Sequence, residues 1–330
     1  MRTTSLGLLG LTLALAPLAA RGASEGPKFA LPLACQIGRS CEVQHYVDRD
    51  PGPSALDYRC GHRTYQAHNG IDIRLLDMAA ERAGVDVLAA AAGRVVRLRD
   101  GVQDISIRAP GAPSVAGQEC GNGVVVDHGD GWETQYCHLA RGSVRVKVGE
   151  EVKAGQPLAH VGLSGDTEFP HLHFTVRHAA QVVDPFAPDM SRPTVCRAQP
   201  NTLWTAAAQR QLTYKAGAVL NGGFASGPVT MAAVEEGGVG PPTATTPLIA
   251  YARLIGLETG DVIELVLTGP GGQVLLQNQL APLTSDKDQY VAYAGKKPPA
   301  GGWPHGAYSA EVRVRRAGAV AITRRFTATI

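Results

Sequence analysis

Glycine and proline interrupt this chain so often that it has room for few long helices. Its 330 residues include 39 glycines and 22 prolines. The stretches between them are mostly short apolar runs, many of which alternate with polar residues. Runs of this kind, bounded by turn residues, are typical of β-strands. The spacing argues against coiled coils and helical repeats, and no low-complexity period indicates disorder. We therefore expect a mostly β protein.

The length predicts two domains, because one domain usually takes about 100–200 residues. The composition and patterning of the sequence change around residues 193–200. We place a first domain at residues 24–195, with its core at about 60–186, and a second at residues 196–330. The second contains short alternating runs and one histidine, His305. This pattern favours an immunoglobulin-like β-sandwich with an accessory role.

Local patterns predict the individual elements. Asp77 is a candidate cap for a helix at 78–83 that Gly84 ends, and residues 99–119 should form a long loop. Residues 87–98 read as a strand pair that turns at Gly93. Further strands are expected at 66–75, 123–128, 132–139, 170–177, 248–255, 262–267, 274–279, 290–294, 307–314 and 320–328.

The first 23 residues have the composition of a secretory signal peptide. Arg2 precedes an apolar stretch at residues 6–18, and small residues follow up to Ala23. This stretch is too short to span a membrane, and no later run is apolar over the ~18 residues that a spanning helix needs. We therefore predict an exported protein, periplasmic or secreted, with no membrane span in the mature chain.

Six cysteines, an even number, are consistent with an exported and oxidised protein. From the spacing, two disulfides are plausible, Cys35 with Cys41 and Cys120 with Cys137. Cys60 and Cys196 are then left over. The chain lacks the Cys-x-x-Cys spacing that is typical of a structural zinc site. The net charge is only +2, and two arginines lie in the expected signal peptide. A nearly neutral mature chain gives no electrostatic reason to expect a nucleic-acid partner.

Among ten histidines, the pattern His171-Leu172-His173 is the first to suggest chemistry. In a strand, residues i and i+2 face the same side, so the two imidazoles would stand together. Two imidazoles are costly in an apolar core unless both find partners. A metal ion or a solvated cleft would supply them. On its own, however, a His-x-His pair is weak evidence.

The second pattern is His68-Asn69-Gly70-Ile71-Asp72. In a straight strand His68 and Asp72 would lie about 13 Å apart, too far to share an ion that each approaches to ~2 Å. A shared ion therefore requires a bend, and Asn69-Gly70 can supply one. A hairpin turn with exposed polar flanks is the plainer interpretation of this motif alone.

Taken together, these patterns propose a metal site. His68, Asp72 and one imidazole of the later pair supply two nitrogens and one carboxylate oxygen, a ligand set typical of zinc with an open fourth position. An open position indicates catalysis. The spare imidazole and His138 could then accept a proton and stabilise an oxyanion.

The chain resembles the lysostaphin-type, or β-lytic, zinc metallopeptidases that cleave bacterial peptidoglycan. The similarity covers about residues 60–186, and its strongest matches are His-x-x-x-Asp at 68–72, Tyr-x-His-Leu at 136–139 and Pro-His-Leu-His-Phe at 170–174. It implies an antiparallel β catalytic domain. It also implies Zn²⁺ held by His68, Asp72 and His173, with His138 and His171 as catalytic residues. The implied activity is hydrolysis of the peptide cross-links of peptidoglycan, without a glutamate base.

Tyr65 and Tyr136 are additional candidates for a hydrogen bond to the oxyanion, Tyr136 because it should share a strand face with His138.

Two other functions stay open at this point. Relatives that lack ligands act as activators of other wall enzymes, so a non-catalytic wall-binding or activator protein is one alternative. All five required positions are filled here, which favours the enzyme. A biotin- or lipoyl-carrier-like module around Lys153 is the other alternative, suggested by the paired glycine turns of residues 148–161. The same turns are common in the metallopeptidase family.

Overall fold

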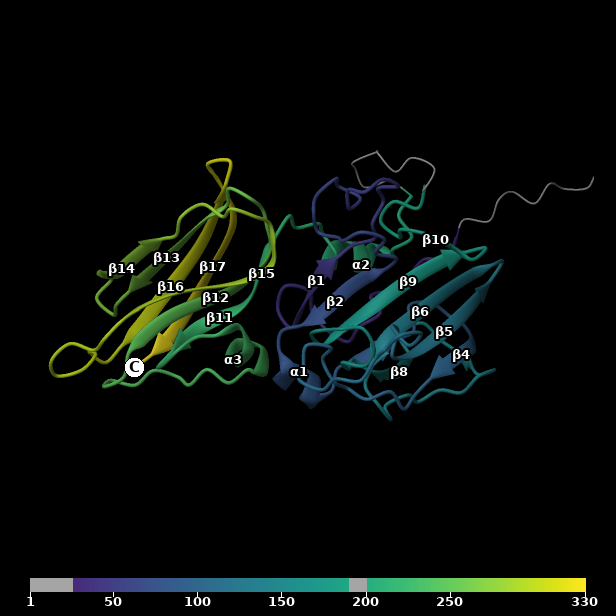
Figure 1. Ribbon diagram of the computed structural model, residues 1–330, viewed down its shortest axis with the longest axis horizontal. Helices are drawn as coiled ribbons and strands as arrows, with labels where there is room; N and C mark the ends of the chain where they lie inside the picture. Colours follow the sequence, from purple (N-terminus) through teal and green to yellow (C-terminus); the bar gives the residue numbers. More distant parts are fainter. Residues whose placement is uncertain (1–25, 190–200) are drawn as a thin grey trace, which may run out of the picture.

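The computed structural model describes residues 26–189 and 201–330, and antiparallel sheets make up most of its regular structure. An eight-stranded sheet dominates the N-terminal part, in the order β1-β2-β9-β6-β5-β4-β7, with β10 paired to β9 (Figure 1). β3 and β8 form a separate two-stranded sheet. The strands of this part are β1 (Cys41–His45), β2 (Ile71–Leu75), β3 (Asp86–Leu88), β4 (Gly93–Arg99), β5 (Asn122–Gly129), β6 (Trp132–Leu139), β7 (Glu151–Val152), β8 (Pro157–His160), β9 (His171–His178) and β10 (Gln181–Val182).

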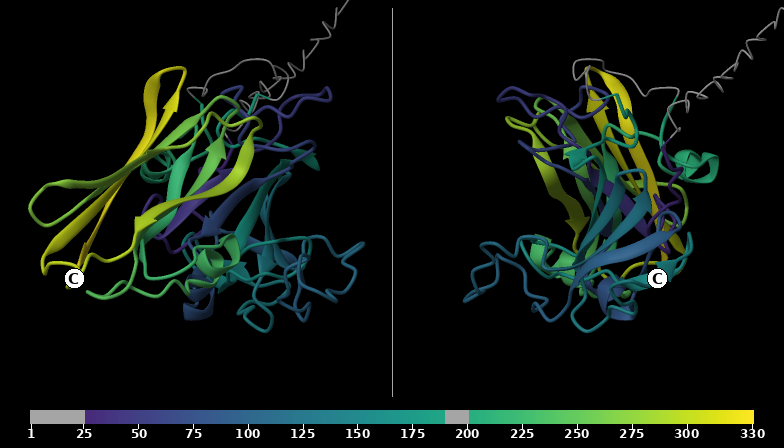
Figure 2. Two further views of the ribbon diagram at one scale, coloured as in Figure 1. Left: turned by 60° about the vertical axis from the view of Figure 1, so that its left-hand side comes forward. Right: turned by 90° about the vertical axis from the view of Figure 1, so that its right-hand side faces the viewer.

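The C-terminal part contains two further antiparallel sheets, β11-β12-β15 and β14-β13-β16-β17. Figure 2 shows the strands of these two sheets, and both sheets contribute buried side chains to one apolar core. The expected mostly β fold, with an additional β-sandwich-like part, is confirmed. These strands are β11 (Ala218–Ala225), β12 (Leu248–Leu257), β13 (Val262–Thr268), β14 (Val274–Gln279), β15 (Lys287–Lys296), β16 (Ala307–Arg316) and β17 (Ala319–Thr329).

Helices are short: α1 (Met78–Ala83), α2 (Ala206–Gln211) and α3 (Met231–Glu236). As expected, Asp77 caps α1 by accepting a hydrogen bond from the Ala80 N–H at 2.9 Å, and Gly84 ends the helix. Within residues 26–189 and 201–330, no helix has the length and apolar character needed to cross a bilayer.

The predicted signal peptide lies outside the described residues, and so does most of the segment around the predicted boundary at 195 and 196. Leu203, Trp204 and α2 pack against the core of the N-terminal part. The division into two domains therefore stays a prediction.

Two sequence expectations for local structure are wrong. Residues 87–98 do not form a hairpin: β3 pairs with β8, and β4 pairs with β5. Gly93 begins β4 rather than making a turn. A Cβ there would lie 2.3 Å from the carbonyl oxygen of Asp127, so close approach of the neighbouring strand explains the glycine. The first half of the expected strand 66–75 is irregular, and only Ile71–Leu75 is a strand.

Both plausible disulfides are present. Cys35 is joined to Cys41, and Cys120 to Cys137. Cys60 is also disulfide-bonded, and Cys196 lies outside the described residues. The Cys120–Cys137 bridge ties the end of the long loop to β6, next to His138.

Candidate metal centre

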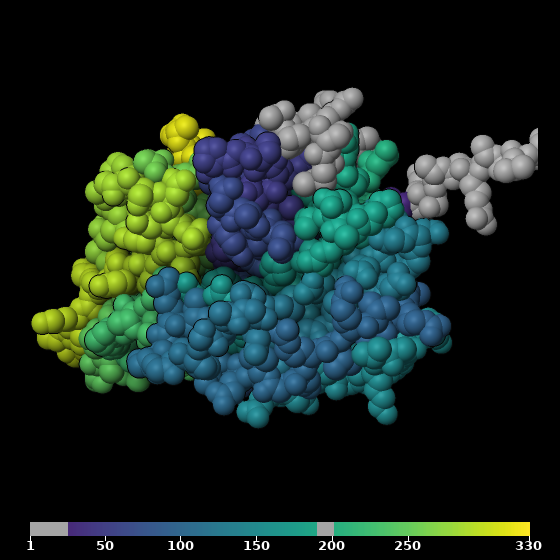
Figure 3. Space-filling model, turned by 45° about the vertical axis from the view of Figure 1, so that its right-hand side comes forward, coloured from purple at the N-terminus to yellow at the C-terminus, as the bar shows by residue number. Residues whose placement is uncertain are grey.

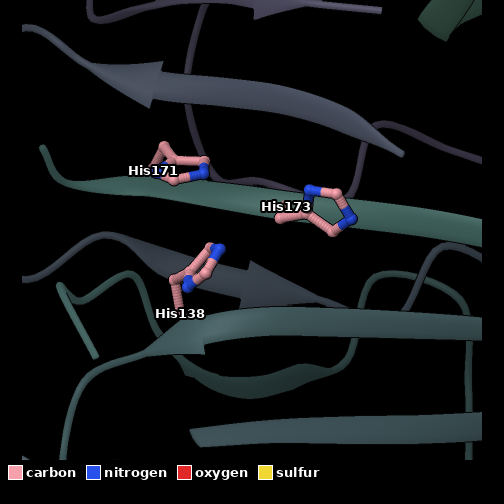
Figure 4. Close-up of side chains that lie close together, drawn as sticks. All are labelled: His138, His171 and His173. Atoms are coloured by element: carbon pink, nitrogen blue, oxygen red, sulfur yellow. The ribbon is translucent and has the colours of Figure 1, made fainter. Parts of the chain in front are cut away.

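Three adjacent strands bring the candidate side chains to one place on the large sheet. Asp72 on β2 lies directly opposite His173 on β9, and Cys137 on β6 lies on the other side of His173. His138 follows Cys137 at the end of β6. Figure 4 shows His171 and His173 along β9 with His138 beside them. Sheet pairing thus joins segments that are far apart in the sequence.

The chain bends before β2, as the metal hypothesis requires. Gly70 is a bend residue between His68 and Asp72, as expected, but neither Asn69 nor Gly70 adopts a positive φ; the positive φ of 62° belongs to Ala67, which precedes His68. Gly70 has a further role: a Cβ at this position would lie 2.5 Å from Nε2 of His173. The absent side chain lets the turn and the His173 ring come together.

Three potential ligand atoms converge at this point. Nε2 of His68 lies 3.2 Å from Oδ1 of Asp72 and 3.2 Å from Nδ1 of His173, and Nδ1 of His173 lies 2.9 Å from the same oxygen. Ligands at ~2 Å from one ion in a tetrahedron stand about 3.3 Å apart. The spacing of the three atoms therefore fits a single small cation.

The outer hydrogen bonds of the two imidazoles support this interpretation. Nδ1 of His68 lies 2.6 Å from the carbonyl oxygen of Tyr46, and a carbonyl can only accept. Nε2 of His173 lies 3.0 Å from Oδ1 of Asn69 and 3.1 Å from the Thr175 hydroxyl. If each ring places its proton on this outer nitrogen, the inner nitrogens and the Asp72 oxygen turn lone pairs toward one another. A bound cation relieves that repulsion, and partners of this kind orient metal-binding histidines.

Burial and mutual contact set the charges of the site. Burial alone would raise the pKa of Asp72, but the imidazoles of His68 and His171 and hydrogen bonds from His171 and His173 hold this pKa well below its usual value. Burial lowers the pKa of His173 despite the neighbouring carboxylate. The site therefore combines an ionised carboxylate with a neutral imidazole, which are the forms that bind metal ions.

His138 and His171 border this cluster. Nδ1 of His138 donates to the carbonyl oxygen of Ser164 at 2.8 Å, and its ring centroid lies 4.5 Å from that of His171. Burial, reinforced by His171 and His173, lowers the pKa of His138 well below its usual value. Nδ1 of His171 lies 3.0 Å from the Thr167 hydroxyl, and its Nε2 lies 3.4 Å from Oδ1 of Asp72. His138, His171 and His173 form a second group that could hold a metal ion.

Of the two tyrosine candidates, only Tyr65 reaches the site. It is 49% exposed, and its ring stacks on His68 at a centroid distance of 4.3 Å. Tyr136 is buried in the apolar core, where its hydroxyl accepts a hydrogen bond from the Ala90 N–H. The expected shared face fails because His138 adopts a positive φ of 61°, which breaks the alternation at the end of β6.

His45 also contacts the site, although no motif in the sequence indicates it. It lies on β1 opposite Asp72, and its Nδ1 is 3.0 Å from Oδ2 of Asp72. The strand-like run Cys41–His45 could have indicated a strand next to the site, but the prolines and turn residues around it obscured this pattern.

Two clefts meet at the cluster and share Tyr65, His138 and Asp166 in their walls. The first, of about 320 Å³, extends over β6 and β9 toward Arg177. The second, of about 540 Å³, extends past Arg108 in the long loop to residues 286–289 on and before β15. Figure 3 shows a groove between the purple N-terminal residues and the blue residues that follow β4. An extended chain could therefore lie across the site.

Comparisons with known proteins match the part of the chain that carries the cluster. Peptidase family M23 matches residues 66–185. The cell division protein DipM of Caulobacter vibrioides is 46% identical over 68 residues, or 21% of this chain and 11% of DipM. The murein hydrolase activator EnvC of Escherichia coli is 45% identical over 62 residues, or 19% and 14%. The peptidoglycan DD-endopeptidase ShyB of Vibrio cholerae is 39% identical over 70 residues, or 21% and 16%.

The chain thus covers less than a fifth of each of these three relatives. The matched range nevertheless includes all five candidate side chains predicted from the sequence. The chain contains a domain of peptidase family M23 at residues 66–185.

Proposed function

We propose that this protein is a zinc metalloendopeptidase that hydrolyses peptide cross-links of bacterial peptidoglycan. The observation that carries the proposal is the convergence of His68 Nε2, Asp72 Oδ1 and His173 Nδ1 within 3.2 Å of one another. Two imidazole nitrogens and one carboxylate oxygen favour Zn²⁺ over harder cations. His68, Asp72 and His173 would hold the ion.

A zinc ion at this position would lower the pKa of water and polarise the scissile carbonyl. The protein's own groups would manage the protons. His138, neutral because burial depresses its pKa, has its Nδ1 engaged by Ser164 and its Nε2 available to accept a proton from the attacking water. His171, oriented through Nδ1, lies beside it to bind the oxyanion. Water adds to the carbonyl carbon, the C–N bond breaks, and the leaving amine takes up the proton.

The choice of substrate rests on the family and on the shape of the site. ShyB is a peptidoglycan endopeptidase by name, and the two joined clefts offer an extended path for a peptide. The disulfides Cys35–Cys41 and Cys120–Cys137 fit an oxidising compartment. We place the protein in the bacterial envelope, exported to the periplasm or beyond.

Digestion of purified peptidoglycan tests the proposal. The zinc-loaded full chain should release fragments with new amine and carboxylate ends, identified by mass spectrometry. A chelator should stop the reaction and added zinc should restore it. Absence of new ends from a folded, zinc-loaded sample would contradict hydrolysis.

The likeness to EnvC supports a second candidate, an activator of other wall hydrolases. The two functions can be distinguished in an assay that adds a separate murein hydrolase. If the protein is an activator, the parent chain and the Asp72→Ala variant should stimulate that hydrolase equally well. A peptidase should cleave alone and lose cleavage with the same substitution.

A further inference from the structure

We propose that His45 is a positioning residue of the metal centre, holding the Asp72 carboxylate in its binding orientation, and that Asp288 of the C-terminal part steadies His45. This inference rests on the proposed function, in which Asp72 is a metal ligand. It gives the C-terminal part a direct connection to the chemistry.

Each of the three proposed ligands has an outer partner. Tyr46 fills this role for His68, and Asn69 with Thr175 fills it for His173. For Asp72 the partner is His45, whose Nδ1 donates to Oδ2 at 3.0 Å while Oδ1 faces the other two ligands. A carboxylate fixed through one oxygen presents the other in a set direction. Such outer contacts raise the affinity of a site for its metal.

The His45 ring is firmly placed. His45 is only 7% exposed, and β1 sets it opposite Asp72 in the sheet. Its ring makes edge contacts with Tyr65 at 5.3 Å and His68 at 5.9 Å between centroids. A histidine that merely filled the core would not need its nitrogen aligned with the outer oxygen of Asp72.

The opposite edge of the ring faces the C-terminal part. Nε2 of His45 lies 3.6 Å from Oδ1 of Asp288 on β15. The backbone at Asp288 is itself fixed, because Nε2 of Gln44 donates to its carbonyl oxygen at 2.9 Å. The Asp288 side chain is 77% exposed, so water screens this contact and we expect it to contribute less than the buried one.

A matched pair of variants isolates the hydrogen bond from the packing. The amide nitrogen of asparagine can take the place of Nδ1, whereas that of glutamine falls near Nε2. We expect His45→Asn to keep most of the zinc affinity. His45→Gln and His45→Ala should lose about 10–100-fold, measured on the full chain by competition with a chromophoric chelator. The absorption spectrum of the cobalt-loaded chain should change in the same two variants.

Asp288→Asn should weaken zinc binding by up to about fivefold, as removal of a screened ion pair does. His305→Ala, far from the site in the C-terminal part, serves as the control and should leave both affinity and spectrum unchanged.

Zinc affinities of His45→Asn and His45→Gln within twofold of each other, in folded samples, would overturn the inference and leave the proposed function standing. A parent chain that binds zinc tightly but cleaves no wall would overturn the proposed function, while the ranking of the His45 variants still decides this inference. A parent chain that binds no zinc would overturn both.

Discussion

The two β parts of the molecule treat buried polar side chains differently. In the C-terminal part, buried charges meet opposite charges: Asp261 binds Arg316, and Arg253 binds Glu235. In the N-terminal part, one nitrogen of His68 and one of His173 crowd around the same oxygen of Asp72. Burying polar groups costs free energy unless partners compensate. The comparison teaches that a candidate functional site is marked less by polarity itself than by several polar atoms that converge on one partner.

Among the variants proposed here, Asp72→Ala should have the largest effect, because it removes the side chain on which the polar atoms of the N-terminal part converge. Asp72→Ala takes away the carboxylate that unites the site, so we expect loss of bound zinc and of wall cleavage down to background. Metal content and product analysis measure the effect. Glu151→Ala removes an exposed carboxylate paired with Arg94 and should behave like the parent. Undiminished cleavage by Asp72→Ala would refute the zinc mechanism.

His138 allows the catalytic role to be separated from metal binding. His138→Ala should lower kcat by about 10²–10⁴-fold, the usual contribution of a general base, while zinc affinity stays within about twofold of the parent. His178→Ala, which removes an exposed imidazole at the end of β9, should leave kcat unchanged. A large loss of zinc in His138→Ala would instead assign His138 to the ligands.

Glu235 tests how much the buried arginines at the junction of the two parts depend on their carboxylate partner. Arg74 on β2 and Arg253 on β12 are both fully buried, and both bind Oε2 of Glu235 on α3. Glu235→Ala should lower the free energy of unfolding by about 3–5 kcal/mol, because it leaves buried charges without their partner.

The neighbouring residue of α3 provides the control for this experiment. Glu236 pairs with Arg82 at the surface, so Glu236→Ala should cost about 1 kcal/mol or less. Equal losses in chemical denaturation of the two variants would show that the junction does not depend on the buried pair.

Asp184 should make the stability of the folded protein depend on pH. Burial raises its pKa to about 7, against 3.8 for the ordinary group, although the Phe186 N–H donates to Oδ1 at 2.9 Å. The folded state therefore holds this proton more tightly than the unfolded state. Its stabilising contribution is complete below about pH 4 and is lost as the pH rises to about 7, by at most ~1.4 kcal/mol per unit.

Asp184→Asn removes this titration. Between pH 4 and 7, the variant should therefore lose less stability with rising pH than the parent, as measured by denaturant unfolding at several pH values. Parallel pH profiles for the two chains would contradict the elevated pKa.

Much of the fold was predictable because side-chain alternation and turn residues are local signals. The hairpin of β5 and β6, the helix α1 and the later strands appear close to their expected positions. The five site candidates were recognisable because their motifs are compact. Pairing over long distances was not: β3 and β4 are neighbours in the chain, yet they join different sheets. His45 was missed for the same reason, because only the register of β1 against β2 reveals its contact with Asp72.

The direct pairing of Asp72 with His173 across β2 and β9 sets a limit on how this segment can vary. Successive side chains of a strand point to opposite faces, so adding or deleting one residue between Gly70 and Asp72 would turn the carboxylate to the other side of the sheet. Substitutions at Ile71 can preserve that geometry, but changes of length cannot. This stretch can therefore tolerate substitutions during evolution, but not insertions or deletions.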